Sequence, residues 1–290
     1  MENKNLNFFK KNGYLLIESL FSEKEVLNLR KKIQELSNNR ERMFLLSALC
    51  FKQIEIYKLI FNKKLVETYR EIIQEDVYLV PDLHIQINNF PKDKFSGWHY
   101  DSQSERRNEY SKEKNRKFFR VGIYLQDNNS DHGGGIDVDK SILHKFIPLR
   151  TPRFIEIYIV KFFSILFSKT INFKKGSAIL FDSKLPHRST SRKISPDNEN
   201  YKDKYTIYFS IGSKKNCELY LKNSINRMFQ NHSRPEASKY FSNHVKLHEL
   251  DDFSTEFLDM LKLNKIGMIT SGKEQSTFFK SFEKYIENLK

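Results

Sequence analysis

The sequence has few of the features that mark secreted or repeat proteins. Its 290 residues contain only two cysteines, Cys50 and Cys217, and neither lies in a CxxC pair. A disulfide framework is therefore not expected, and a reducing, cytoplasmic location fits this cysteine usage. The first residues contain no apolar core of a signal peptide, so none is expected, and there is no internal repeat or low-complexity segment.

Long apolar runs are also missing, so no membrane span is expected. The most apolar stretch covers residues 154–167, is too short to cross a bilayer and contains Glu156 and Lys161. We interpret it as a strand or helix of the core. A segment that lies on a membrane surface is the alternative.

The charge balance is strongly basic, with a formal net charge of +14 and a pI of about 9.5. Such a charge favours an anionic partner, which could be nucleic acid, a membrane surface or a phosphorylated substrate. The lysines are spread along the whole chain, however, and this favours a general compositional bias instead. The sequence contains no RNP motif, zinc finger or basic zipper, so nucleic-acid binding is not expected.

The remaining composition is typical of a globular protein with a real core, since 39% of the residues are hydrophobic and 14% aromatic. A capping box, Ser22 with Glu25 three residues later, predicts the start of a helix. Further helices are predicted at 64–73, 251–263 and 275–289, and strands at 14–17, 77–88, 118–125, 177–181 and 205–211. Several short strands with almost no βαβ alternation predict a sandwich or jelly roll.

One short motif points to chemistry. The run Gly97-Trp98-His99-Tyr100-Asp101 is answered far downstream by Leu185-Pro186-His187. Residues i and i+2 of a strand point to the same side, so His99 and Asp101 could reach one metal ion while a second strand supplies His187. Two histidines and one carboxylate form the facial triad that holds Fe(II) and leaves its other positions open.

These motifs stand among others that together resemble the phytanoyl-CoA dioxygenase family of Fe(II)/2-oxoglutarate oxygenases. The resemblance covers about residues 7–212 and follows the order of the family's motifs. The matching segments are Phe9-x-x-x-Gly13-Tyr14-Leu15-Leu16, Ile85-Gln86-Ile87-Asn88, Trp98-His99-Tyr100-Asp101, Arg120 to Asp127, Gly134-Gly135-Ile136-Asp137-Val138, Lys140-Ser141-x-x-His144-Lys145, and Lys175-Gly176-Ser177-x-x-Leu180-Phe181-Asp182 before His187.

The resemblance implies a fold, a metal site and a reaction. The fold is mainly β with flanking helices, a double-stranded β-helix (a cupin-like jelly roll) over residues 1–213, with a mostly helical extension at 214–290 packed on the same domain. His99, Asp101 and His187 would be the metal and catalytic residues. The cofactors would be Fe(II), 2-oxoglutarate and O2, and a small organic substrate would be hydroxylated or otherwise oxidised with release of succinate and CO2.

The chain departs from the family at the residue that binds the distal carboxylate of 2-oxoglutarate. The family places an arginine at the start of the strand after the second histidine, where this chain has Lys204. Lysine can supply a charge-assisted contact, but not the bidentate fork of arginine. Arg192 is the competing candidate. Ser189 and Gln86 resemble family positions that line the same cosubstrate.

The resemblance leaves the substrate and the oligomeric state open. Asp101 argues against halogenation, because related halogenases carry a small residue in place of this carboxylate. Cationic residues crowd the segments expected to rim the metal, which favours an anionic substrate; a solvated basic rim is the alternative. They are Arg106, Arg107, Arg116, Lys117, Arg120, Arg188, Arg192, Lys193 and Lys202. The alternative function is a non-catalytic metal-binding jelly-roll protein that has lost turnover of 2-oxoglutarate.

Overall fold

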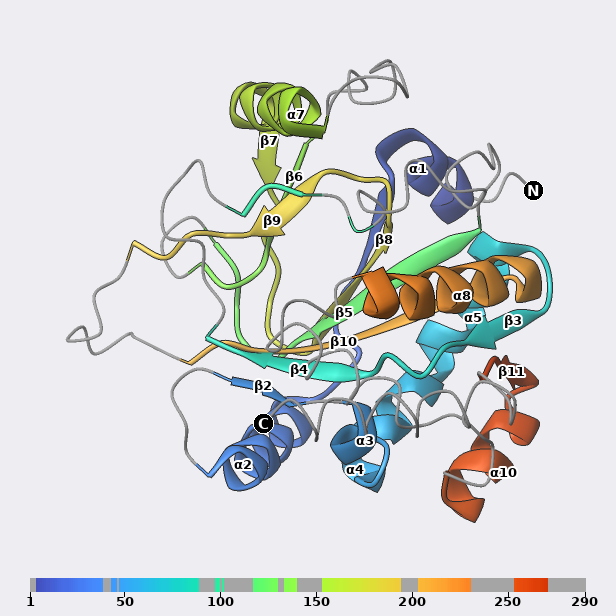
Figure 1. Cartoon of the computed structure of the whole chain (residues 1–290). Helices are drawn as coiled ribbons and strands as arrows, with labels where there is room; N and C mark the ends of the chain where they lie inside the picture. The colour runs from blue at the N-terminus through green and yellow to red at the C-terminus, as the bar shows by residue number, and fades with distance from the viewer. Residues whose placement is uncertain are drawn as a thin grey trace, which may run out of the picture. The chain divides into compact units, whose positions relative to one another are not determined.

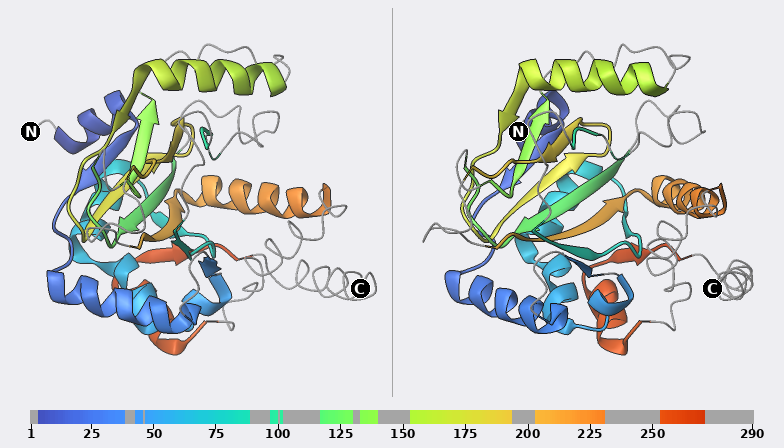
Figure 2. Two further views of the ribbon diagram at one scale, coloured as in Figure 1. Left: turned by 90° about the vertical axis from the view of Figure 1, so that its left-hand side faces the viewer. Right: turned by 60° about the vertical axis from the view of Figure 1, so that its left-hand side comes forward.

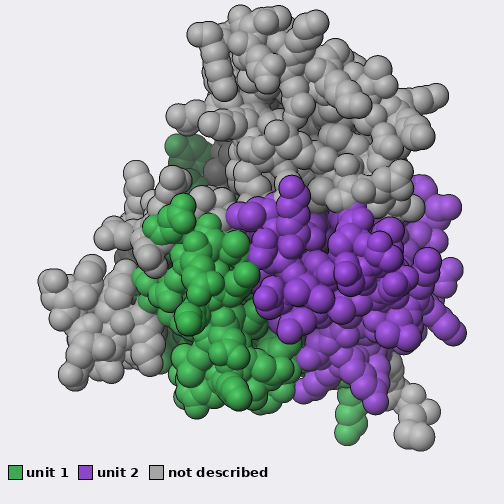
Figure 3. Space-filling view, turned by 90° about the horizontal axis from the view of Figure 1, so that it is seen from below, with its two compact units in different colours: residues 1–44, 86–114, 119–207 green, residues 45–85, 115–118, 208–290 purple. Residues whose placement is uncertain are grey.

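A computed structural model of the chain (Figures 1 and 2) describes residues 4–38, 43–45, 47–88, 97–99, 101, 117–129, 133–139, 153–193, 203–230 and 253–270. The chain divides into two compact units, which Figure 3 distinguishes by colour. Unit 1 consists of residues 1–44, 86–114 and 119–207, and unit 2 of residues 45–85, 115–118 and 208–290. The predicted boundary between 1–213 and 214–290 stays a prediction.

Unit 1 contains a sheet in which the order is β1-β8-β5-β10, and β4 also pairs with β10. The strands are β1 (Tyr14–Ile17), β4 (His84–Ile87), β5 (Phe118–Tyr124), β8 (Ser177–Asp182) and β10 (Tyr205–Gly212), and the unit boundary falls within β4, β5 and β10. Strand β8 is antiparallel to both β1 and β5. The Leu125 N–H donates to the Tyr205 carbonyl at 3.1 Å, which joins the end of β5 to the start of β10.

A second, smaller sheet in unit 1 has the order β7-β6-β9. Its strands are β6 (Ile136–Asp139), β7 (Ser168–Thr170) and β9 (His187–Ser189), and α7 (Arg153–Phe167) lies between β6 and β7 along the chain. Strand β6 is antiparallel to β9, and Val138 pairs with His187. The small sheet therefore fixes the backbone of the second histidine of the predicted triad.

Two helices complete unit 1, α1 (Lys4–Asn12) and α2 (Glu23–Ser37). The predicted capping box is confirmed, since the Ser22 hydroxyl accepts from the Glu25 N–H and the Glu25 carboxylate from the Ser22 N–H. Arg30 of α2 donates to the carbonyls of Leu125 and Asp203 at 3.1 and 3.0 Å. These bonds hold α2 beside the start of β10.

Unit 2 contains the end of β10, which pairs antiparallel with β3, and β3 pairs in parallel with β11. Its elements are α3 (Ser47–Cys50), α4 (Ile54–Tyr57), the 3-10 helix η1 (Lys58–Phe61), α5 (Lys63–Ile73), β3 (Val77–Leu79), α8 (Lys214–Gln230), α10 (Thr255–Leu263) and β11 (Ile266–Met268); β2 (Met43–Leu45) pairs with β4. The fully buried Phe257 ring lies 5.1 Å from Phe51 and 5.2 Å from Tyr57. Aromatic packing of this kind holds α10 in the core of the unit.

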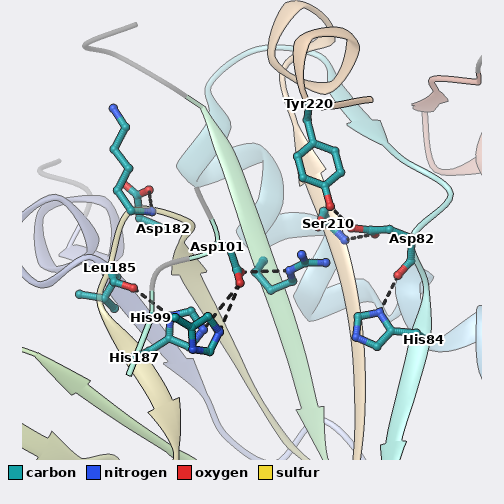
Figure 4. A network of polar contacts seen from close by, with 11 residues as sticks. Asp82, His84, His99, Asp101, Asp182, Leu185, His187, Ser210 and Tyr220 are labelled. Carbon is teal, nitrogen blue, oxygen red and sulfur yellow. Dashed lines mark hydrogen bonds and ion pairs between the residues drawn. The ribbon is translucent and has the colours of Figure 1, made fainter. Parts of the chain in front are cut away.

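The structure corrects the bounds of two predicted elements. The predicted strand 77–88 is two strands, because the chain turns at residues 80–83, where the Asp82 carboxylate accepts from the N–H and hydroxyl of Ser210 (Figure 4). The predicted helix 251–263 begins at Thr255, after Ser254 caps its first turn. The other strands and the helix at 64–73 are confirmed to within a residue or two. The predicted helix 275–289 lies outside the described residues.

Candidate metal centre and its surroundings

Three side chains from two segments that are distant in sequence meet in unit 1. His99 and His187 exchange two backbone hydrogen bonds, His99 N–H to His187 O at 3.0 Å and the reverse at 2.8 Å. The Oδ1 atom of Asp101 lies 3.7 Å from His99 Nε2 and 3.9 Å from His187 Nε2 (Figure 4). The structure thus brings together the three residues that the sequence singled out, although Asp101 lies in a turn rather than in a strand.

Each imidazole is oriented by a hydrogen bond from its other nitrogen. Nδ1 of His99 lies 2.7 Å from the Gly97 carbonyl oxygen, and Nδ1 of His187 lies 2.8 Å from the Leu185 carbonyl oxygen. A carbonyl can only accept, so each Nδ1 carries a hydrogen, and in a neutral imidazole the lone pair is then on Nε2, the nitrogen on the side of Asp101. Metal-ligating histidines show this arrangement in which the non-ligating nitrogen donates to a fixed acceptor.

Arg120, which the sequence suggested only as one of the cations at the rim of the metal, contacts a candidate ligand directly. It lies on β5, and its Nε donates to Asp101 Oδ2 at 3.3 Å, which leaves Oδ1 facing the two imidazoles. The signal in the sequence was a lone charge inside the otherwise apolar strand 118–125. A charge at such a position needs a buried partner, and here the partner is the candidate ligand.

The electrostatics keep the carboxylate charged and the buried imidazole neutral. Burial by itself would raise the pKa of Asp101, but the Arg120 guanidinium and then the two imidazoles hold this pKa well below its usual range. Burial, with a smaller effect of His99, lowers the pKa of His187 to about 4. At neutral pH the cluster therefore offers the Asp101 carboxylate and the neutral imidazole of His187, which are the forms of these two side chains that bind a metal ion.

The donor set fits a divalent transition metal. Among the residues that the structure describes, these three form the group of His, Cys, Asp and Glu side chains whose ligand atoms lie within 4.8 Å of one another. Nitrogen and oxygen ligands lie about 2.1 Å from such an ion, so only small side-chain movements would let all three reach it. Two histidines and one carboxylate, with no thiolate, favour Fe(II) over a structural zinc site.

A second polar cluster, which we call the cation pair, consists of Lys204 and Arg192. Lys204 is fully buried at the start of β10, and its Nζ donates to the Ser189 hydroxyl at 2.8 Å. Burial, and then the nearby Arg192 guanidinium, lower the pKa of Lys204 to about 7. Ser189 follows His187 by two residues on β9, so both side chains point to the same side of that strand. The cation pair is therefore linked to the metal candidates through one short strand.

Backbone contacts fix the position of Lys204. Asn88 donates its N–H to the Lys204 carbonyl at 2.9 Å and accepts from the Lys204 N–H at 2.8 Å. Gln86, the remaining predicted cosubstrate residue, lies half-buried on β4 two residues before Asn88. Of the four predicted cosubstrate residues, Lys204 and Ser189 are therefore in contact, and Arg192 is near enough to lower the pKa of Lys204. Gln86 is placed only by its position on β4.

A buried ion pair supports β9 through the side chains that point the other way. Arg188, between His187 and Ser189, donates to the Asp137 carboxylate at 3.0 Å, and both side chains are buried. The Thr190 hydroxyl also donates to this carboxylate, at 2.9 Å. The Arg188 guanidinium lies 5.1 Å from the centroid of the Trp98 ring, which precedes His99 in the chain. One ion pair therefore contacts the neighbours of both histidines.

Two of the cations expected to rim the metal thus have carboxylate partners in unit 1, Arg120 with Asp101 and Arg188 with Asp137. Lys193 is exposed, and Lys117 pairs with Glu75 in unit 2. Arg106, Arg107, Arg116 and Lys202 lie outside the described residues. The anionic character of the substrate stays a prediction, and it depends on fewer cations than the sequence suggested.

Several solved structures share the fold of this chain. HygX from Streptomyces hygroscopicus with nickel and 2-oxoglutarate bound matches with a TM-score of 0.54 at 16% sequence identity, over 74% of this chain and 88% of HygX. EctD from S. alaskensis with bound Fe matches with a TM-score of 0.54 at 16% identity, over 74% of this chain and 78% of EctD. The non-heme alpha-ketoglutarate-dependent carbocyclase SnoK from nogalamycin biosynthesis matches with a TM-score of 0.54 at 12% identity, over 73% and 84% of the two chains.

No protein-family model and no curated protein sequence matches the chain. The likeness is therefore one of structure, and at these identities it establishes the fold. The predicted fold class is confirmed, since the chain has a mixed sheet with flanking helices and shares the jelly-roll fold of these enzymes. No helix among the described residues is long and apolar enough to cross a membrane.

Proposed function

We propose that this chain is an Fe(II)/2-oxoglutarate-dependent oxygenase that resembles the phytanoyl-CoA dioxygenase family. The observation that carries the proposal is the joint placement of two sites along β9. His187 belongs to the two-histidine, one-carboxylate cluster, and Ser189, two residues later, contacts the buried Lys204. An oxygenase of this class needs a metal site beside a site for a dicarboxylate, and this strand contributes a residue to each.

His99, Asp101 and His187 would hold the iron. Bound Fe(II) would supply the site at which O2 and 2-oxoglutarate react to give succinate, CO2 and an oxidised substrate. The protein keeps Asp101 ionised through Arg120, and the carbonyls of Gly97 and Leu185 accept from Nδ1 of the two imidazoles and so orient each Nε2 for the metal. The carboxylate at position 101 favours hydroxylation or another oxidation over halogenation.

Lys204 would bind the distal carboxylate of 2-oxoglutarate, with Ser189 as a second hydrogen-bond partner. Burial and the neighbouring Arg192 both disfavour the charged form of Lys204, and an incoming carboxylate would offset both effects. Arg192 then adds its charge to the same anion. The two candidates that the sequence set against each other would therefore act together, with Lys204 as the direct contact.

Structures with the same fold support the proposed class of reaction, but not the choice of Lys204. HygX has been solved with nickel, 2-oxoglutarate and hygromycin B, and EctD with 2-oxoglutarate and 5-hydroxyectoine. Their organic ligands differ in chemistry, so the shared fold gives no substrate for this chain. We infer only a small organic molecule, and its anionic character remains part of the proposal.

The test is release of succinate from 2-oxoglutarate by the purified full chain with Fe(II) and O2, which needs no known substrate. We expect slow turnover in the wild type and none in His99→Ala. His84→Ala is the matched control, because it also removes a buried histidine, but one that belongs to unit 2 and not to the candidate metal ligands. Fe(II) binding without any succinate would favour the alternative, a metal-binding protein without turnover.

A further inference from the structure

Helix α7 carries a stripe of large apolar side chains that are exposed. Tyr158, Phe162 and Leu166 expose 71%, 60% and 59% of their surface, and Ile155 and Phe167 expose 39% and 48%. Positions 155, 158, 162 and 166 follow the three- and four-residue spacing of a single helical face. Scattered exposed apolar residues are ordinary, but five on one short helix mark a surface that binds something apolar.

The opposite side of α7 is attached to the small sheet of unit 1. Ser164 is fully buried, and its hydroxyl donates to Asp139 at the end of β6 at 3.1 Å. Helix α7 also continues directly into β7, which pairs with β6, so both of these strands hold the helix in place (Figure 2). The stripe is therefore presented by an anchored helix.

The sequence around the stripe is basic. Residues 140–170, which include α7, contain six lysines or arginines and a single acidic residue, Glu156. Among the described residues of this stretch, Lys169 is exposed directly after the helix. Apolar side chains beside basic ones are the composition of a helix that lies on an anionic bilayer, where the apolar face enters the headgroup region and the cations contact the lipid phosphates.

We propose that α7 is a docking surface for an anionic lipid bilayer. The helix has 15 residues and is therefore about 22 Å long, which is shorter than the hydrocarbon core of about 30 Å, so it would lie in the plane of the interface. A second copy of the chain fits the stripe less well. The net charge of +14 on each chain opposes the approach of a second copy.

This proposal does not depend on the proposed oxygenase activity, and binding to vesicles tests it directly. The full chain is floated with vesicles of phosphatidylcholine alone or mixed with phosphatidylglycerol, at low and high salt. We expect binding to the anionic mixture that falls with salt, and little binding to phosphatidylcholine alone. Equal binding to both, or to neither, would overturn the proposal.

Two pairs of matched variants locate the surface. Phe162→Ser should weaken partitioning about tenfold, the factor expected when one large apolar side chain no longer leaves water. Leu27→Ser, which removes an exposed apolar residue from α2, should leave partitioning unchanged. Lys169→Glu should weaken partitioning to anionic vesicles about fivefold for each unit of charge that it changes. Lys24→Glu, at an exposed position on α2, should have little effect on partitioning. Equal losses in a variant and its control would place the contact elsewhere.

Two further measurements distinguish insertion of the stripe into a bilayer from contact with a second copy of the chain. Phe162→Trp retains an aromatic side chain, and its added emission should shift to the blue with anionic vesicles; no shift would contradict insertion of the stripe. Light scattering measures the mass of wild type and Phe162→Ser. A wild-type dimer that Phe162→Ser converts to a monomer, with vesicle binding unchanged, would assign the stripe to a second copy and overturn the bilayer.

Discussion

Replacement of Lys204 by methionine removes a buried cation while it keeps most of the side-chain volume. Lys204 is fully buried, and its pKa falls from the ordinary 10.5 to about 7, first through burial and then through Arg192. A drop of this size corresponds to on the order of 5 kcal/mol that disfavours the cation in the folded protein. The ligand-free protein therefore bears a cost at Lys204 that a bound carboxylate would offset.

Lys204→Met should change ligand affinity and stability in opposite directions. Loss of one partner from a buried charge pair costs about 2–4 kcal/mol, so we expect the Kd for 2-oxoglutarate to rise by roughly 30- to 700-fold. The free energy of unfolding of the ligand-free protein should instead increase, because the buried cation is gone. Anaerobic titration calorimetry measures the first quantity, and urea unfolding measures the second.

The pH dependence has a definite sign. Between pH 7 and the ordinary pKa of lysine, the unfolded chain holds a proton that folded Lys204 has lost, so its contribution makes stability rise with pH in this window. Binding of 2-oxoglutarate should weaken above about pH 7, because it requires the charged amine. Lys204→Met should lose both dependences, and Lys193→Met, at an exposed site, should keep them. A variant that binds 2-oxoglutarate like the wild type would refute the reasoning.

Three further perturbations test neighbouring parts of the account. Arg120→Gln should weaken Fe(II) binding about 10- to 100-fold in calorimetry, since an outer partner that orients a ligand carboxylate contributes this much; unchanged affinity would show that Asp101 needs no such support. Arg188→Ala leaves the buried Asp137 without its charged partner, so the free energy of unfolding in urea should fall by about 3–5 kcal/mol. A fall below about 1 kcal/mol would contradict the contribution of this pair to stability. Ser22→Ala removes the cap of α2, so the free energy of unfolding in urea should fall by about 1 kcal/mol while the affinity for Fe(II) stays unchanged.

The metal candidates could be predicted because their pattern is local in sequence and chemically specific. His99 and Asp101 are two residues apart, and His187 follows a recognisable strand and turn. Their support could not be predicted in the same way. Arg120 and Asp101 meet because the fold places β5 beside the turn that contains Asp101. The sequence alone suggested only that Arg120 is one of several cations at the rim of the metal.

Long-range placement also decided the remaining corrections. The strand predicted at 77–88 has suitable residues, but the contact between Asp82 and Ser210, which are 128 positions apart, belongs to a turn that divides it. The apolar stretch 154–167 was interpreted as core, since hydrophobicity does not reveal which face is covered. In the structure Ser164 faces inward and Phe162 outward, so one side of α7 is packed and the other exposed.

Anaerobic visible spectroscopy asks whether one site of this protein holds Fe(II) and 2-oxoglutarate together. The account predicts a weak metal-to-ligand charge-transfer band when both Fe(II) and 2-oxoglutarate are present, absent with either alone and lost in His99→Ala. Fe(II) binding with no band at saturating 2-oxoglutarate would contradict the account, because Lys204 would then fail to take the place of the family's arginine.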